Sequence, residues 1–316
     1  MKGLNKAVDA IHSAKHIAIS GHVNPDGDSV GSMLALGLGL EDLGKRVYMI
    51  SADAIPNQYR SLPGARRIVR RTDAPVDLAA AVDCGSGEML GPTLDLFKAA
   101  ANILEVDHHE FRRPFGTIAL IDKDAAAVAE IVFTLLRALN VTITKPIAQN
   151  LMTSIIVETN SFRLPNTRPL TFDICADLLH KGIDFYSLVD KVFWTRRPSA
   201  TILSGMCLSR CAFMKAGRLV WSIIRRDDFD SAGGRDEDVD PVPDDMRSID
   251  GVKIAVLFRE NGNGMLRVSL RSKGRVNVAA IAEHYNGGGH FDVAGCLIKN
   301  DSSSVRDLLS RAARLL

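Results

Sequence analysis

Short apolar runs alternate with longer helical patterns through the first half of the chain. The apolar runs typical of strands are His16–Ser20, Arg46–Ile50, Leu78–Val82 and Ile103–Val106. The stretches with a helical pattern are Ser29–Leu43, Ala126–Leu139, Pro146–Val157 and Pro169–Leu179. Because strands alternate with helices, we predict βαβ units and a doubly wound α/β domain with a mostly parallel sheet over residues 1–185.

The pattern changes in the second half. It stays helical from Asp184 to about Ala212, and we interpret residues 186–214 as a helical connector. Strand-like runs return at Leu219–Ile224, Val252–Phe258 and Met265–Arg271, with hairpin-turn residues at Asn261–Gly264. This order predicts a smaller α+β domain over residues 215–316.

An acidic stretch, Asp227–Asp250, separates the first two of these runs. It contains Gly and Pro residues but lacks the ligand spacing and the glycine turn of a calcium loop. We therefore expect a solvated loop.

Composition narrows the class of protein. A length of 316 residues suits two domains, and 46% hydrophobic with 24% charged residues excludes a disordered or fibrous chain. The net charge of +2 provides no strong attraction to nucleic acid. The start of the chain does not resemble a signal peptide, and the apolar run Met33–Leu40 is too short to span a bilayer. Five scattered cysteines suit reduced thiols, so we expect a cytoplasmic protein without a membrane partner.

Acidic residues and histidines follow three of the predicted strands. His22, Asp26 and Asp28 come after the first strand, Asp83 ends the third, and Asp107-His108-His109 ends the fourth. Taken singly, such residues cap helices or form turns. The carboxyl ends of parallel strands, however, form the ligand crevice of open α/β sheets, so we expect these side chains to lie together.

Carboxylates and neutral imidazoles gathered in one crevice require a cation between them. Mixed oxygen and nitrogen ligands suit Mn²⁺ or a similar ion. Two such ions, bridged by one carboxylate, would activate a water and stabilise charge on a phosphoryl group. The reaction predicted is therefore hydrolysis of a phosphoester or phosphoanhydride.

The Asp107-His108-His109 triplet, the His22-x-x-Pro25-Asp26-x-Asp28 motif and Asp83 together resemble the DHH phosphoesterases. This resemblance implies two sets of ligands for Mn²⁺, with Mg²⁺ or Co²⁺ as alternatives: His22, Asp26 and Asp83 for one ion, and Asp28, Asp83, His108 and Glu158 for the other. Asp83 would then bridge the two ions. The resemblance also implies catalytic roles for His109, which contacts the substrate phosphate or orients the site, and for Asp107, which supports its neighbours.

The chain departs from the family pattern in one segment. The family normally has Asp where this sequence has Glu158, and Gly where it has Asn160. Glutamate keeps the carboxylate but adds a methylene group. We therefore expect the second ion to be bound either at an altered distance or more weakly.

The second domain resembles the DHH-associated C-terminal domain, through Arg271-Ser272, Val276-Asn277-Val278 and the run Gly287-Gly288-Gly289-His290. Successive glycines allow a backbone to approach an anion closely, although such runs are more often plain turns. The resemblance implies that Arg271, Ser272, the three glycines and His290 bind a terminal phosphate or nucleotide of the substrate, across an interdomain cleft from the metals.

Within the family, this two-domain form is most similar to the nanoRNase and 3′-phosphoadenosine-5′-phosphate phosphatase group. That similarity implies hydrolysis of short oligonucleotides or linear dinucleotides to mononucleotides, with bisphosphorylated adenosine as a further substrate. The alternatives are a cyclic-dinucleotide phosphodiesterase, an exopolyphosphatase or pyrophosphatase, and a catalytically weak nucleotide-binding protein. Long duplex nucleic acid is not expected as a partner, and a homodimer is compatible with the pattern.

Four arginines, Arg66, Arg67, Arg70 and Arg71, remain outside this scheme. They could form a patch for nucleic acid, but their spacing without aromatic residues fits a solvated surface at least as well.

Overall fold

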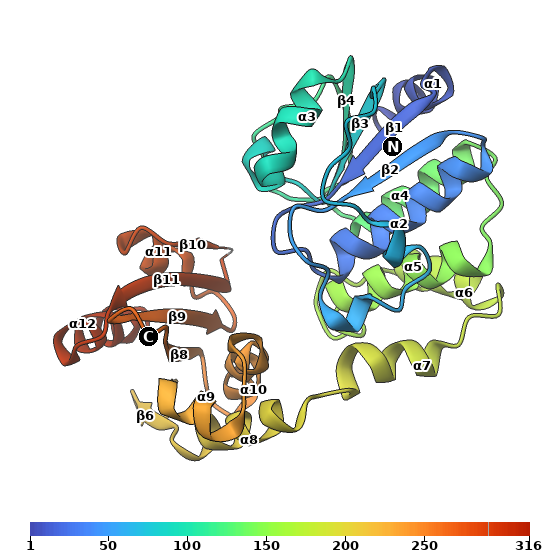
Figure 1. Ribbon diagram of the computed structural model, residues 1–316. Coiled ribbons are helices and arrows are strands. Elements are labelled where there is room, and N and C mark those ends of the chain that lie inside the picture. Colours follow the sequence, from blue (N-terminus) through green and yellow to red (C-terminus); the bar gives the residue numbers. More distant parts are fainter. Residues whose placement is uncertain (290) are drawn as a thin grey trace. The chain divides into compact units, whose positions relative to one another are not determined.

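The computed structural model describes residues 1–289 and 291–316 and divides the chain into two compact units, Met1–Thr195 and Arg196–Leu316 (Figure 1). The boundary lies within the stretch 186–214. Whether that stretch acts as a connector remains a prediction. No helix of the described residues is both long and apolar enough to cross a membrane, and the five cysteines are free thiols.

A parallel sheet with the strand order β2-β1-β3-β4-β5 forms the centre of the first unit. Its strands are β1 (His16–Ser20), β2 (Arg46–Ile50), β3 (Leu78–Val82), β4 (Asn102–Asp107) and β5 (Ile118–Ile121). Four of them were predicted, and β5 is an addition. Every residue of β3 is buried, as expected for a central parallel strand covered on both faces.

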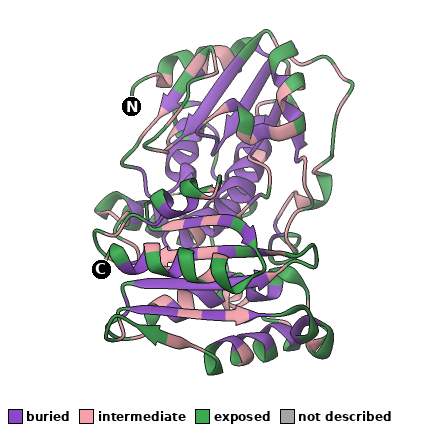
Figure 2. Ribbon diagram, turned by 90° about the vertical axis from the view of Figure 1, so that its left-hand side faces the viewer, coloured by how far each residue is buried: buried purple, intermediate pink, exposed green. Residues whose placement is uncertain are grey.

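Helices cover both faces of this sheet, which confirms the doubly wound architecture. Ile17, Ala80 and Val82 belong to a large core beneath the principal helices, α2 (Gly27–Asp42), α4 (Val128–Ala138) and α5 (Lys145–Glu158). Alternate residues such as Ala79 and Ala81 belong to a smaller core with Phe97 of α3 (Leu94–Ala99). Figure 2 shows the buried residues following these strands and helices.

The other elements of the first unit lie around this framework. They are α1 (Leu4–Ser13), the short 3-10 helices η1 (Asn57–Tyr59), η2 (Ala65–Arg67) and η3 (Gly87–Thr93), α6 (Pro169–Leu179), α7 (Phe185–Val189) and a π-helical turn, η4 (Asp190–Trp194).

A mixed sheet with the order β10-β11-β9-β8-β7-β6 forms the second unit. Its strands are β6 (Ala212–Met214), β7 (Leu219–Ile224), β8 (Ile254–Glu260), β9 (Met265–Ser272), β10 (Gly288–Gly289) and β11 (Val293–Lys299). Its helices are α8 (Pro198–Ser209), α9 (Arg226–Ala232), η5 (Asp236–Val239), α10 (Val242–Ser248), α11 (Ala279–His284) and α12 (Ser302–Arg314). One core joins the sheet to α11 and α12, and another joins it to α8, α9 and α10.

The expectation of a solvated loop at Asp227–Asp250 is wrong. This stretch forms α9, η5 and α10, and Phe229, Val242 and Met246 are buried beneath the sheet. The physical reason is that β7 and β8 are parallel neighbours, which require a crossover between them. Several of the acidic residues have structural partners: Asp236 and Asp240 bind the buried guanidinium of Arg259, both at 2.8 Å.

Candidate metal centre

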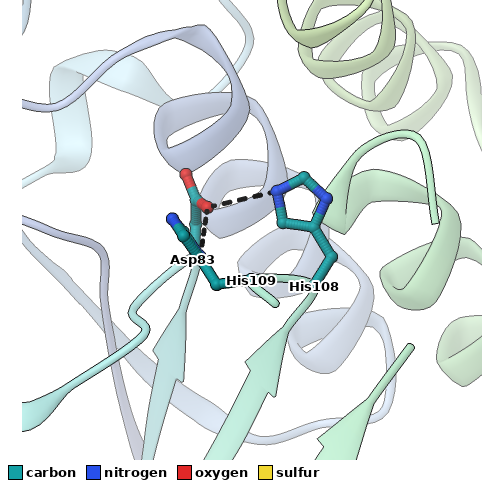
Figure 3. A group of neighbouring side chains, drawn as sticks. All are labelled: Asp83, His108 and His109. Atoms are coloured by element: carbon teal, nitrogen blue, oxygen red, sulfur yellow. Dashed lines mark ion pairs between the residues drawn. The ribbon is translucent and has the colours of Figure 1, made fainter. Parts of the chain in front are cut away.

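Asp83 lies at the centre of the predicted site. Because β1, β3 and β4 are parallel neighbours, their carboxyl ends meet at one edge of the sheet. His22 Nε2 lies 3.4 Å from Asp83 Oδ2, and His108 Nε2 and His109 Nδ1 each lie 3.8 Å from Asp83 Oδ1. Figure 3 shows the Asp83 carboxylate facing the two adjacent imidazoles.

The backbone fixes the direction of the Asp83 side chain. Asp83 is buried and adopts a left-handed conformation with φ of 59°, while its N–H donates to the carbonyl of Val106 at 3.0 Å. Aspartate and asparagine tolerate this conformation better than most residues. Leaving the strand in this way turns the carboxylate into the crevice.

Two imidazoles are oriented by backbone carbonyls. Nδ1 of His22 donates to the carbonyl of Val23 at 2.8 Å, and Nδ1 of His108 donates to that of Ala125 at 3.0 Å. A carbonyl can only accept, so in the neutral form of each ring Nε2 carries the lone pair. Both Nε2 atoms face carboxylates, which is the arrangement of metal-binding histidines.

Asp26 both caps a helix and belongs to the site. Its Oδ1 accepts from the N–H of Ser29 at 3.0 Å and lies 3.7 Å from His22 Nε2. Burial alone would lower the pKa of His22, but the carboxylates of Asp26 and Asp83 outweigh it and raise the pKa to about 11. Burial acts to raise the pKa of Asp26, and the bond to His22 holds it below its usual value.

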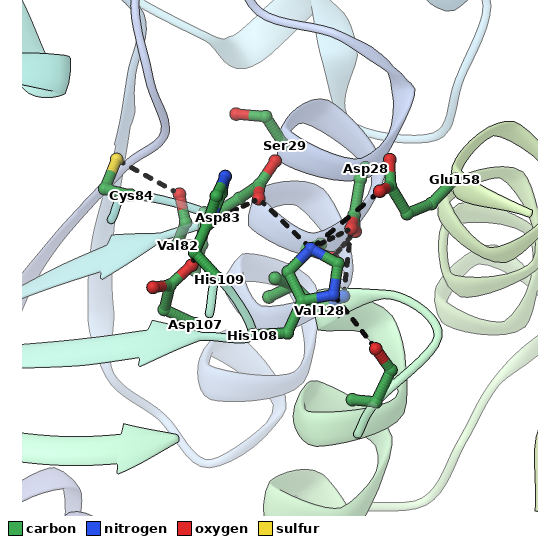
Figure 4. A network of polar contacts seen from close by, with 12 residues as sticks. Asp28, Ser29, Val82, Asp83, Cys84, Asp107, His108, His109, Val128 and Glu158 are labelled. Atoms are coloured by element: carbon green, nitrogen blue, oxygen red, sulfur yellow. Dashed lines mark hydrogen bonds and ion pairs between the residues drawn. The ribbon is translucent and has the colours of Figure 1, made fainter. Parts of the chain in front are cut away.

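Asp28 is fully buried and held from three directions. Its Oδ1 accepts from the hydroxyls of Ser32 at 3.0 Å and Ser154 at 2.5 Å. Its Oδ2 accepts from the N–H of Val128 at 2.9 Å (Figure 4). The same Oδ2 lies 3.8 Å from His108 Nε2. Burial and the neighbouring charge of Asp83 raise the pKa of Asp28 to about 7.

Glu158 is the last residue of α5, and its side chain reaches the site. Its Oε1 lies 3.9 Å from His108 Nε2, and one third of its side chain is exposed. Burial and the charges of Asp28 and Asp83 raise the pKa of Glu158 to about 9. Asn160, two residues later, has a φ of 46°, a conformation that suits the glycine expected there and that asparagine also tolerates.

Sequence reasoning missed the side chains that hold Asp107. Its Oδ1 accepts from His109 Nδ1 at 2.7 Å, and its Oδ2 accepts from Arg112 Nε at 2.8 Å. Arg112 also pairs with the buried Glu105 at 2.9 Å. Glu105 was the available signal in the sequence, because it lies inside the apolar run Ile103–Val106 and a buried carboxylate requires a partner. For Ser32 and Ser154, which hold Asp28, we find no comparable signal in the sequence.

These residues form two overlapping groups. We call His22, Asp26 and Asp83 the His22 group, and Asp28, Asp83, His108 and Glu158 the His108 group. Ligand atoms of the whole His22 group lie within 4.8 Å of one another, as do those of Asp83, His108 and His109. The assignment of ligands to two ions remains a prediction. The donors nevertheless fit a divalent cation, since four carboxylates converge and the pKa values of Asp28 and Glu158 are raised.

The predicted phosphate-binding residues lie in the second unit, where several have structural partners. Arg271 Nε donates to Asp244 at 3.2 Å, and the buried hydroxyl of Ser272 donates to the carbonyl of Val276 at 2.6 Å. Their proposed contact with substrate stays a prediction.

Close packing explains two of the three glycines in the run Gly287-Gly288-Gly289. At Gly287 and Gly289 a Cβ would lie within 2.2 Å and 2.4 Å of carbonyl oxygens of Gly295 and Val293, so pairing of this segment with β11 excludes larger residues. Gly288 is exposed and has open space around it. His290 lies outside the described residues.

Both units of the chain are similar to known protein families. Residues 16–155 match the DHH family, N-terminal domain, and residues 219–316 match the DHHA1 domain. The bifunctional oligoribonuclease and PAP phosphatase NrnA of Thermus thermophilus is 33% identical over 95% of this chain and 92% of that protein.

Two solved structures share the fold. An exopolyphosphatase-related protein from Bacteroides fragilis superposes with a TM-score of 0.93 at 24% identity, over 99% of this chain and 95% of that chain. RecJ from Thermus thermophilus in complex with Mn²⁺ superposes with a TM-score of 0.59 at 15% identity, over 100% of this chain and 55% of that chain. At these identities, the likeness shows the fold alone.

Proposed function

The chain belongs to the DHH family, and from this premise we propose that it is a metal-dependent phosphoesterase that hydrolyses short oligonucleotides or linear dinucleotides to mononucleotides. The convergence of Asp83 with three imidazoles is the observation that carries the proposal. The relative named as an oligoribonuclease and PAP phosphatase supports the substrate class, because the similarity extends over 92% of its length. We include 3′-phosphoadenosine-5′-phosphate as a second substrate on the same ground.

We propose that the site holds two divalent cations, most simply Mn²⁺, with Asp83 contributing to both. The His22 group would hold one and the His108 group the other. When bound, such a pair activates a water and stabilises charge on the phosphoryl group during in-line displacement. RecJ, which shares the fold, was solved in complex with Mn²⁺.

The protein's own residues would prepare the ligands and the substrate. Backbone carbonyls hold the rings of His22 and His108 with Nε2 toward the carboxylates. The hydrogen bond that His109 donates to Asp107 raises the pKa of His109, although burial acts to lower it. A protonated His109 would donate a charged hydrogen bond to an oxygen of the scissile phosphate.

In the second unit we propose that Arg271, Ser272 and the Gly287–His290 segment bind the end of the substrate. Such a ligand would compete with Asp244 for the guanidinium of Arg271. A cytoplasmic location and a homodimer also remain predictions.

Hydrolysis assays on the purified chain test the proposal directly. The substrates would be a linear adenine dinucleotide, a cyclic adenine dinucleotide, 3′-phosphoadenosine-5′-phosphate and polyphosphate, each with Mn²⁺ or with EDTA. We expect Mn²⁺-dependent release of AMP from the linear dinucleotide at a higher kcat/KM than from the cyclic one. Preferred cleavage of polyphosphate, or no cleavage of any substrate across Mn²⁺, Mg²⁺ and Co²⁺, would overturn the assignment.

A further inference from the structure

An open cavity of about 680 Å³ lies beside the metal centre in the first unit. Its walls come from the end of β2 and from the segment that contains η1 and η2. The lining residues on which the argument rests are Ser51, Asp53, Ile55, Arg60, Arg66 and Arg70. A volume of this size lies within the range of small-molecule sites.

The cavity carries a surplus of positive charge. Arg60, Arg66 and Arg70 contribute guanidinium groups, and Asp53 is the one acidic residue of the lining. Within the part of the chain that the structure describes, no carboxylate forms an ion pair with any of the three arginines. The neighbouring Arg67, in contrast, pairs with Glu41 and does not line the cavity.

Two of these guanidinium groups are held in place without being neutralised. Arg60 Nε donates to the carbonyl of Ile55 at 2.8 Å, and Arg70 Nη1 donates to the carbonyl of Ala52. Val69, next to Arg70, pairs with Ile50 at the end of β2. The cations are therefore attached to ordered backbone around the opening, and an anion would relieve their mutual repulsion.

A hydrogen bond links the lining of the cavity to the loop that carries His22 and Asp26. Asp53 Oδ2 accepts from the N–H of Asn24 at 2.8 Å, and Asn24 lies between His22 and Asp26 in the loop after β1. Tyr59 of η1 lies against the end of this loop, where α2 begins, because a Cβ on Gly27 would lie 3.0 Å from its ring. A polyanion whose scissile phosphate is at the metals would thus meet this cationic cavity along the same loop.

The chemistry of the lining favours a sugar-phosphate unit. The guanidinium groups match phosphate, Ser51 and Ser61 are neutral polar residues, and Ile55 and Ile68 provide an apolar wall. The lining contains no aromatic ring, so stacking of a base is not expected.

We propose that this cavity is a second anion-binding site, which takes a non-scissile phosphate of an oligonucleotide longer than two nucleotides. The inference rests on the proposed function. It also gives a role to Arg66 and Arg70, for which the sequence allowed either a nucleic-acid patch or a solvated surface.

The test compares Arg66→Gln/Arg70→Gln with the matched control Arg46→Gln/Arg71→Gln, which removes the same charge from exposed residues outside the lining. Kinetics would be measured on a dinucleotide and a tetranucleotide with Mn²⁺. For the cavity variant we expect a roughly tenfold higher KM on the tetranucleotide, an unchanged kcat, and unchanged dinucleotide kinetics. The salt dependence of tetranucleotide KM should also weaken, and the control should behave as wild type.

Three results would overturn the inference: an unchanged tetranucleotide KM, an equal rise of KM for both substrates, or the same change in the control. An unchanged tetranucleotide KM with lost binding of AMP to the EDTA-treated protein would assign the cavity to free nucleotide instead. If wild type cleaves neither substrate, the proposed function fails separately. Fluorescence anisotropy of a labelled tetranucleotide with EDTA then decides the inference, which requires about tenfold weaker binding by the cavity variant than by the control.

Discussion

The His22 group and the His108 group share Asp83 but differ in how their charges are compensated. In the His22 group one imidazole lies between two carboxylates, at 3.7 Å from Asp26 and 3.4 Å from Asp83. The pKa of that imidazole is raised to about 11, and the pKa of Asp26 is lowered. A proton on His22 therefore stabilises the Asp26 carboxylate.

In the His108 group one imidazole faces three carboxylates, at 3.8 to 3.9 Å. Burial acts against the charged ring, yet these carboxylates raise the pKa of His108 to about 9. The pKa values of Asp28 and Glu158 are also raised, so this group carries negative charge that one imidazolium does not offset. The His108 group therefore depends more strongly than the His22 group on a divalent cation, or on protons in its place.

The largest effect is expected at the residue common to both groups. Asp83→Asn keeps the side-chain size and tolerates the left-handed backbone, but it removes a charge from each proposed ion site. We expect kcat on the linear dinucleotide to fall about a thousandfold. The melting temperature should confirm that the variant is folded. Retention of more than about a tenth of the activity would show that Asp83 does not act in both groups.

Glu158→Gln tests the His108 group without changing the His22 group. It removes one carboxylate from the His108 group and leaves the His22 group intact, so we expect about a hundredfold loss of kcat. Glu110→Gln, at an exposed position two residues beyond His108, is the matched control and should match wild type. Glu158→Asp retains the charge and should stay within about tenfold of wild type. Equal losses in the Gln and Asp variants would mean that side-chain length, not charge, determines the contribution.

Ser154→Ala removes a hydrogen bond to Asp28 of the His108 group. The Ser154 hydroxyl donates to Asp28 at 2.5 Å and helps to lower the pKa of that carboxyl. Without it we expect about tenfold more Mn²⁺ to be needed for half-maximal activity, with little change in kcat at saturating metal. Ser209→Ala, an exposed serine of the second unit, serves as control. An unchanged requirement for Mn²⁺ would remove Asp28 from the proposed ligands.

The pH dependence of stability should distinguish metal-free from metal-bound protein. Asp28 and Glu158 have pKa values of about 7 and about 9, above the usual 3.8 and 4.5. Their contribution to stability is fully present below about pH 4 and is lost as the pH rises through these raised values. The metal-free melting temperature should therefore fall between about pH 5 and 9, whereas the increase caused by Mn²⁺ should grow.

Melting curves at pH 5.5, 7 and 8.5, with EDTA or with Mn²⁺, would measure both trends. In Glu158→Gln the decline between pH 7 and 8.5 should be shallower than in wild type, because the group that titrates there is absent. An Mn²⁺ increment that shrinks with rising pH would contradict the comparison between the two groups.

Much of the fold followed from local patterns in the sequence. The predicted strands at His16–Ser20, Arg46–Ile50, Leu78–Val82 and Leu219–Ile224 match the observed bounds, as does the helix at Pro169–Leu179. Buried parallel strands are short, continuous apolar runs, which makes them visible without tertiary information. The edge strand β5 was missed, and only one of its four residues is buried.

Other features depended on partners distant in the chain. The crossover at Asp227–Asp250 looked like a loop because its charges are frequent, yet Asp236 and Asp240 bind Arg259 on a neighbouring strand. The bond from Ser154 to Asp28 spans 126 positions of the sequence. No local pattern indicates which serine faces which carboxylate.

The sequence by itself determined that acids and histidines leave the carboxyl ends of three parallel strands, because strand direction and the place of each residue in its strand are local properties. The tertiary structure decided which carboxylates of the site surround which imidazole. Only the packing of α5 and α4 against α2 buries Asp28 and brings Glu158 to His108. Burial and the distances between charges govern the electrostatic energies, and both arise when segments far apart in the chain fold together.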